Sequence, residues 1–69
     1  MLAEREAEVL EVSPVQIHGV PYADVAVRYR DGVVASARLG RESIPVDLSV
    51  GERVMVQVAM AVIVAVRRL

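Results

Sequence analysis

Residues Val46–Leu69 read V-D-L-S-V-G-E-R-V-M-V-Q-V-A-M-A-V-I-V-A-V-R-R-L, and this stretch decides the fold class of the chain. The run Val54–Val66 carries no charge, and at its start valines alternate with Met55 and Gln57. A period of two in a segment rich in β-branched residues is typical of a strand and not of a helix. The C-terminal third is therefore expected to be β-structure.

This stretch divides into two predicted strands. The first is Glu52–Val58, which follows a Val-Gly-Glu-Arg turn, and the second is Val62–Arg67. A turn near Ala59–Ala61 would join them, although it contains no glycine. One long bent strand is the alternative interpretation.

The middle of the chain predicts a hairpin. Tyr22–Arg30 alternates cleanly between apolar and polar residues, as expected of a half-buried strand. Asp31-Gly32 follows, and glycine accepts the positive φ that a tight turn requires. Strand Val33–Leu39 is then expected to pair back antiparallel.

The N-terminal part predicts one more strand, Ala7–Ser13. Its apolar side changes phase halfway, which a bulge or a strand shared by two halves of a barrel would explain. Pro14 is expected to end it, because proline cannot donate to a ladder, and Val15–Pro21 would be a connection. Met1–Glu6 is interpreted as a frayed start or a turn of helix.

Gly40–Val50 is the longest segment without strand character, and three of its apolar residues are expected to plug one barrel end: Ile44, Val46 and Leu48. The chain is thus predicted to be one all-β domain, residues 1–69. Five short strands with a plug between the third and fourth indicate a small antiparallel barrel of the oligonucleotide/oligosaccharide-binding (OB) type. Its expected interior is Val9, Val25, Val27, Ala35, Ala37, Leu48, Val54, Val56 and Val58.

Size and composition narrow the function classes. A chain of 69 residues buries only about 60% of its unfolded surface, so its own core is small and leaves little room for an enzyme cleft. The net charge of −1 gives no general attraction to phosphate backbones, and two tyrosines are the whole aromatic content. The uncharged run is shorter than the roughly 20 residues of a membrane helix. We expect a cytoplasmic protein with no membrane insertion and no secretory signal.

One further set of residues resembles a known family. The set comprises Gly32 after the second strand, Arg41-Glu42-Ser43 after the third, and the turn Leu48-x-x-Gly51-x-x-Val54 into the fourth. Together with the final apolar hairpin, this pattern is similar to the TOBE (transport-associated OB) domain, which occurs in molybdate-binding molbindins and at the C-terminus of transporter ATPases. The resemblance covers about nine-tenths of the chain. It implies an OB-like barrel that binds a small oxyanion or serves a transporter ATPase.

The resemblance also suggests a site. Arg41 and Ser43 are the candidate ligand-binding residues, since a guanidinium offers a bidentate fork and a serine hydroxyl adds one bond. A solvated loop arginine and a local serine turn are the alternative interpretation. Oxyanion-binding members carry a lysine and a small hydroxyl residue near the end of the fourth strand. Here Val58-Ala59-Met60-Ala61 stands in that place.

Other chemistry is not expected. His18 is the single histidine and there is no cysteine, so we predict no metal site and no cofactor. The serines lack a nucleophile elbow and no phosphate loop is present, so no catalytic residue is predicted. Arg28 and Arg30, with Tyr22 and Tyr29, suggest a nucleic-acid face only as a third alternative. A solvated strand face is the preferred interpretation.

These observations lead to a functional hypothesis with two competing classes. The first is a non-enzymatic TOBE-like module that binds a small oxyanion or regulatory ligand. The second is a structural or protein-interaction module without a small ligand. Both faces of the last strand are apolar, and an exposed apolar patch usually marks an interface. We therefore expect a homo-oligomer that associates through the C-terminal hairpin.

Overall fold

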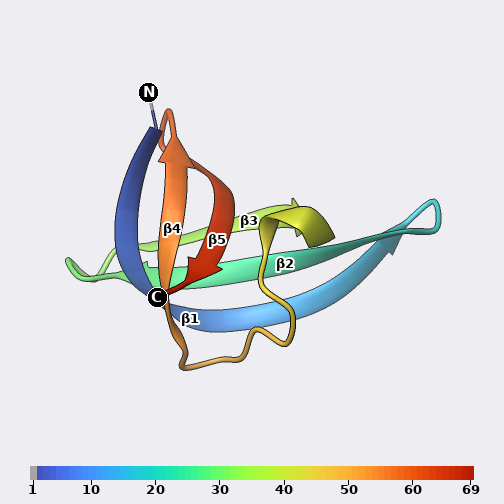
Figure 1. Ribbon diagram of the computed structural model, residues 1–69, viewed down its shortest axis with the longest axis horizontal. Coiled ribbons are helices and arrows are strands. Elements are labelled where there is room, and N and C mark those ends of the chain that lie inside the picture. The colour runs from blue at the N-terminus through green and yellow to red at the C-terminus, as the bar shows by residue number, and fades with distance from the viewer. Residues whose placement is uncertain (1) are drawn as a thin grey trace.

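The computed structural model describes residues 2–69, which form a five-stranded antiparallel sheet in the order β3-β2-β1-β4-β5 (Figure 1). The strands are β1 (Leu2–Ile17), β2 (Val20–Tyr29), β3 (Val34–Gly40), β4 (Arg53–Ala59) and β5 (Val62–Arg68). A short 3-10 helix, η1 (Arg41–Ser43), follows β3. The predicted all-β class with five antiparallel strands is confirmed. This part of the chain contains no helix with the length and apolar character that a membrane crossing needs.

β1 is the longest strand and belongs to both halves of the sheet. Its first part pairs with β4, from Leu2 opposite Ala59 onward, and its later part pairs with β2. The β2 register shifts between Val9 and Glu11. The structure thus contains both a bulge and a shared strand, and either one explains the change of apolar phase in the sequence.

The predicted limits of β1 were wrong at both ends. Residues 2–6 are strand and not a frayed start or helical turn, while Met1 lies outside the described residues. The strand also continues through Pro14, and residues 15–17 and 20–21 pair with each other instead of forming a connection. Proline is tolerated because β4 pairs with β1 only as far as Glu8, so one edge of β1 is free at Pro14.

The remaining strands lie within two residues of their predicted limits. The Asp31-Gly32 hairpin is confirmed: Gly32 has a φ of 90° and its N–H donates to the Tyr29 carbonyl at 3.0 Å. The Asp31 carboxylate accepts the Val33 N–H at 3.0 Å and so closes the turn. The β4–β5 turn is built from Met60 and Ala61, both at positive φ (51° and 66°).

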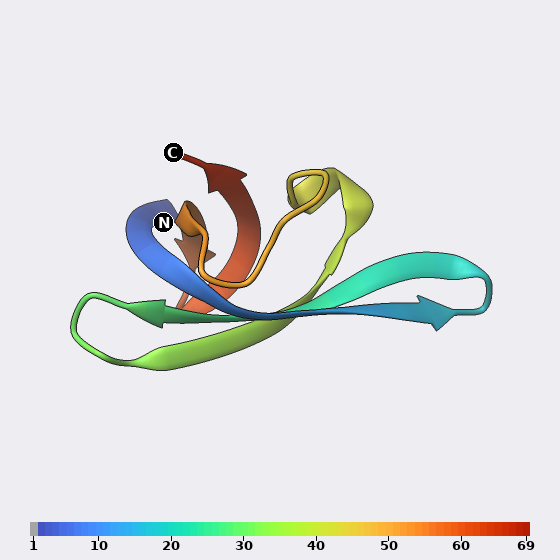
Figure 2. The same cartoon turned by 90° about the horizontal axis from the view of Figure 1, so that it is seen from below.

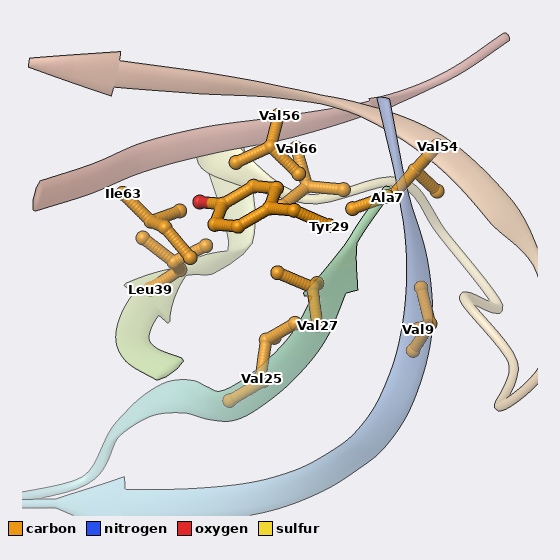
Figure 3. Close-up of a cluster of buried hydrophobic side chains, with 11 residues drawn as sticks. Ala7, Val9, Val25, Val27, Tyr29, Leu39, Val54, Val56, Ile63 and Val66 are labelled. Atoms are coloured by element: carbon orange, nitrogen blue, oxygen red, sulfur yellow. The ribbon is translucent and has the colours of Figure 1, made fainter. Parts of the chain in front are cut away.

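The core lies on one face of the curled sheet, around the ring of Tyr29 (Figure 3). Its buried members are Ala7, Val9, Ala23, Val25, Val27, Tyr29, Leu39, Val54, Val56, Ile63 and Val66. Five of the nine predicted interior residues are in this set: Val9, Val25, Val27, Val54 and Val56. The other four are partly buried and pack against it: Ala35, Ala37, Leu48 and Val58.

The sheet is not closed into the expected barrel. β3 and β5 are its two edges, and no strand ladder joins them in the described structure. They nevertheless approach each other across the core, where Leu39 and Ile63 lie close together (Figure 3). The strap, which we define as residues 44–52, runs past the opening (Figure 2). Ile44 and Leu48 pack against the core, although there is no closed barrel end for them to plug. Val46, the third predicted plug residue, stands in a turn and is 79% exposed.

Candidate functional site

The opening between η1 and the C-terminal half of β5 forms a groove of about 410 Å³. One wall comes from η1 and the start of the strap: Glu42, Ser43, Ile44 and Pro45. The other wall comes from β4 and β5: Gln57, Ala65, Val66, Arg67 and Arg68. The groove exists because β5 has a strand neighbour only on its β4 side, so its other edge faces η1 across open space. Apolar side chains and arginine groups therefore meet in one concave surface.

Arg68 is the groove arginine with the shortest hydrogen bonds to the rest of the chain. Its Nε donates to Oε1 of Glu52 at 2.6 Å, and its Nη2 donates to the Asp47 carbonyl at 3.1 Å. These two bonds fasten the strap to the end of β5. A guanidinium has five N–H groups in a fixed fork, so three remain for a ligand oxygen. The hydrogen bond from Arg68, followed by that from the Ser49 N–H, lowers the pKa of Glu52 below its ordinary range.

Arg67 is held on the outer side of the same strand. Its Nη2 donates to Oε1 of Glu4 at 3.3 Å, and the amide of Gln57 reaches the same carboxylate at 3.5 Å. The hydrogen bond from Arg67 is the main reason that the pKa of Glu4 is lowered. Both arginines of the groove are thus positioned by carboxylates that stay charged near neutral pH.

The two residues predicted from the sequence occupy the same short helix but different surroundings. Ser43 lines the groove, half-buried, whereas Arg41 is exposed and does not line it. Between them, Glu42 folds back toward β3. A Cβ at position 40 would lie 2.5 Å from its Oε1, so Gly40 leaves the space that this carboxylate occupies. The groove is therefore bordered by one serine hydroxyl, two arginines and one acid.

Arg67 and Arg68 are the groove residues that the sequence interpretation missed. They stand at the end of the last predicted strand, and the only feature that distinguished them in the sequence is that two arginines are adjacent. Their proximity to Ser43 depends on β5 returning beside η1, which joins residues more than twenty positions apart. A single sequence contains no compositional or motif signal that predicts this contact between β5 and η1.

The predicted nucleic-acid alternative finds little support in the geometry. A second hollow of about 390 Å³ contains Arg28 and Arg30, but Glu6 and Glu8 line it too. Arg28 is paired with Glu8 at 3.6 Å. The Tyr29 ring is in the core, 6% exposed, so it is no platform for a nucleobase.

His18 lies in the turn between β1 and β2, with a φ of 51°. Within residues 2–69 no group of three or more histidine, aspartate or glutamate side chains is arranged to hold a metal ion. Comparison of the chain with protein-family models, with curated proteins and with solved structures gave no match. The groove is therefore interpreted from its own geometry.

Proposed function

We propose that this chain is a non-enzymatic, OB-like binding module that takes a small ligand with an anionic oxygen group in the groove between η1 and β5. The observation that carries the proposal is that Ser43 and Arg68 line one groove together with the apolar residues Ile44, Pro45 and Val66. Ligand pockets of this kind combine apolar lining with a few placed polar groups. The groove volume of about 410 Å³ suits a small molecule.

The strand arrangement supports the OB-like part of this proposal. A long first strand that pairs with both the second and the fourth strands, and edges formed by the third and fifth, resemble an OB barrel opened along one seam. The resemblance to TOBE domains in the η1 segment points in the same direction. It makes molybdate, tungstate and sulfate the first oxyanions to test, with a transporter ATPase as the proposed larger partner.

The charge state of the acids supports a binding role over catalysis. Arginine hydrogen bonds lower the pKa values of Glu4, Asp24 and Glu52, so these carboxylates are charged acceptors at neutral pH. A general acid needs the opposite shift. Their role is to position guanidinium groups.

The test is calorimetric titration with molybdate, tungstate and sulfate, alongside a single-stranded oligonucleotide at low salt. Ser43→Ala and Arg68→Gln should each weaken oxyanion binding at least about tenfold, because each removes a hydrogen bond to a charged group. Arg30→Gln, on a different surface, is the matched control and should bind as the unmodified chain does. If Arg41→Ala removes binding while Ser43→Ala does not, the ligand sits on η1 outside the groove. Binding of the oligonucleotide alone would favour the nucleic-acid alternative.

A second candidate function, protein interaction through the β4–β5 hairpin, has an observation of its own. The tip of the hairpin is apolar and exposed: Met60 is 88% exposed and Val62 59%. Leu2, opposite Ala59 in the ladder, is 62% exposed beside them. Tight turns with two residues at positive φ normally use glycine or asparagine, so the turn geometry does not account for Met60. A contiguous exposed apolar patch usually marks an interface. The candidate partners are another copy of this chain or a transporter ATPase.

Val62→Asp tests this second candidate. The residue is exposed, so the substitution should leave the fold intact while it places a charge on the hairpin tip. Loss of self-association in sedimentation experiments would assign the expected homo-oligomer to the hairpin. Unchanged sedimentation would remove the hairpin as a self-association surface.

A further inference from the structure

Residues 12–23 form a two-stranded arm that projects from the rest of the sheet (Figures 1 and 2). The arm consists of the end of β1, the His18-Gly19 turn and the start of β2. β4 pairs with β1 only as far as Glu8, and β3 pairs with β2 only as far as Tyr22, so the outer arm has no third strand. An isolated two-stranded ribbon is only marginally stable in water. Beyond Tyr22, the arm therefore has no strand neighbour within this sheet that would stabilise it.

The arm has an apolar face directed away from the core. Val15 pairs with Tyr22, and Ile17 pairs with Val20. Directly paired residues and residues two apart share one side of a ladder, so these four side chains form one surface, the arm face. It lies opposite Ala23 and Val25, which point into the core. Ile17 is 37% and Val20 49% exposed.

The arm carries no Asp, Glu, Lys or Arg along its twelve residues. At the base of the arm, on the side of the arm face, stand Glu11 and Asp24, and Asp24 is paired with Arg38 at 2.7 Å. A second copy can therefore approach the arm face itself without burying an unpaired charge of the arm. Pro14 lies on the free edge of β1 and lacks an N–H, which disfavours extension of the sheet by an added strand. These features favour packing of side-chain faces over edge pairing.

We propose that the arm face packs against the arm face of a second copy of this chain, with the two arms antiparallel about a two-fold axis. Two ribbons stacked about 10 Å apart would form a small β-sandwich, in which each copy supplies the layer that the other lacks. A two-fold contact of one surface with itself is the commonest form of self-association. The arm is thus an assembly element that is separate from the groove.

Charge placement selects the antiparallel arrangement. Glu11 lies at the base of the arm on the side of the arm face, two residues before Ser13 and four before Val15. In the described chain it forms no ion pair and accepts only the Ser13 hydroxyl, at 2.8 Å. Antiparallel stacking brings Glu11 of one copy to the tip of the other arm, where His18 stands. Parallel stacking would instead set the two Glu11 carboxylates side by side, which is unfavourable.

Sedimentation velocity at micromolar concentration tests the interface. The unmodified chain should sediment as a dimer, and Val20→Asp should convert it to the 7.5 kDa monomer. Val46→Asp is the matched control, since Val46 is 79% exposed on the strap, and it should stay dimeric. Circular dichroism should show the same β-spectrum for all variants. A monomeric unmodified chain, or a dimer that survives Val20→Asp, would overturn the proposal.

The hairpin variant separates the rival arrangements. Under the proposal, Val62→Asp leaves the dimer unchanged. Loss of the dimer in Val62→Asp alone would place the contact on the β4–β5 hairpin. Loss of the dimer in both Val62→Asp and Val20→Asp would mean that the arm of one copy rests on the hairpin of the next. Loss of the dimer in Val62→Asp, whether alone or together with Val20→Asp, would therefore overturn the two-fold contact between arms.

Single cysteines test the orientation, because the chain has none of its own. Val15 lies near the middle of the arm, so in an antiparallel pair Val15→Cys should meet its own counterpart and form an intermolecular disulfide on mild oxidation. Val20→Cys, close to the tip, should cross-link much more slowly. Equal cross-linking of both variants would indicate parallel arms and contradict the orientation argued from Glu11 and His18.

Discussion

The guanidinium of Arg5 stacks on the ring of Tyr29, with its Cζ 3.9 Å from the ring centroid. Arg5 comes from the first half of β1 and Tyr29 from the end of β2. Nη2 of Arg5 also donates to Oδ2 of Asp31 at 3.2 Å, in the turn that follows β2. One side chain thus links β1, the aromatic centre of the core and the β2–β3 hairpin. The guanidinium thus covers one face of the Tyr29 ring.

Replacing Arg5 by alanine should therefore lower the free energy of unfolding by about 1 kcal/mol, the value of a cation–π contact at a partly exposed site. Urea unfolding monitored by circular dichroism measures the change. Arg30→Ala is the control, because Arg30 is exposed and takes part in no ion pair that the structure describes. Equal effects of the two substitutions would show that the stacking contributes nothing.

The core is built largely from valine, and its packing has a measurable consequence. Val56 is fully buried in the middle of β4. Val56→Ala removes two methyl groups and leaves a cavity, which should cost about 2 kcal/mol of unfolding free energy. Val46→Ala, at a site 79% exposed, should cost almost nothing. A similar loss at both positions would contradict the assignment of the core to this face of the sheet.

The β4–β5 turn should be easy to stabilise. Met60 and Ala61 both adopt positive φ, where a side chain is strained, and the preferred residues for such a turn are asparagine and glycine. The pair Met60→Asn and Ala61→Gly should raise the unfolding free energy by about 1 kcal/mol or more. Met60→Gln makes the same site polar without the turn preference and should leave the stability nearly unchanged. If Met60→Gln also raised the unfolding free energy, the stabilisation would come from polarity and not from relief of backbone strain.

Acid should destabilise the fold through its ion pairs. Arginine hydrogen bonds lower the pKa values of Glu4 and Glu52 below 4.5, and the Val33 N–H, followed by Arg5, lowers that of Asp31 below 3.8. A depressed pKa in the folded state means that the stabilisation is present above those ordinary values and is lost as the pH falls through the folded-state values. The unfolding free energy should thus decline below about pH 4.5.

A variant with Glu4→Gln and Glu52→Gln isolates this acid effect. It should be less stable than the unmodified chain at pH 7 and lose less stability between pH 5 and pH 3. Thermal unfolding at a series of pH values provides the measurement. Parallel stability curves for the two proteins would show that other groups cause the acid response.

Local patterns predicted most of the strands. The alternation of Tyr22–Tyr29 and the Asp31-Gly32 turn hold in the structure because neighbouring residues and backbone sterics decide them. The limits of β1 were missed for a non-local reason. Pro14 normally ends a strand, yet here it lies where β1 has a neighbour on one side only. Which side of a strand is paired is a property of the whole sheet.

The candidate site shows the same division between local and tertiary information. The η1 segment was found from its sequence, and its Ser43 does line the groove. Arg68 was not found, because its place beside η1 depends on the path of β5 and on the strap that Arg68 holds through Glu52. The exposure of Val46 was also unpredicted, since the strap turns outward there.

The sequence by itself determined the β-class, the hairpin at Asp31-Gly32, the inward valines of β2 and β4 and the small, charge-balanced character of the chain. These follow from side-chain periodicity, turn sterics and composition, which act over a few residues. Only the tertiary structure decided that the sheet stays open between β3 and β5, that a groove forms there, and that residues 12–23 project as an arm. Those features depend on which strands pair and where each pairing stops, and that is set by the collective packing of eleven buried side chains, Tyr29 among them.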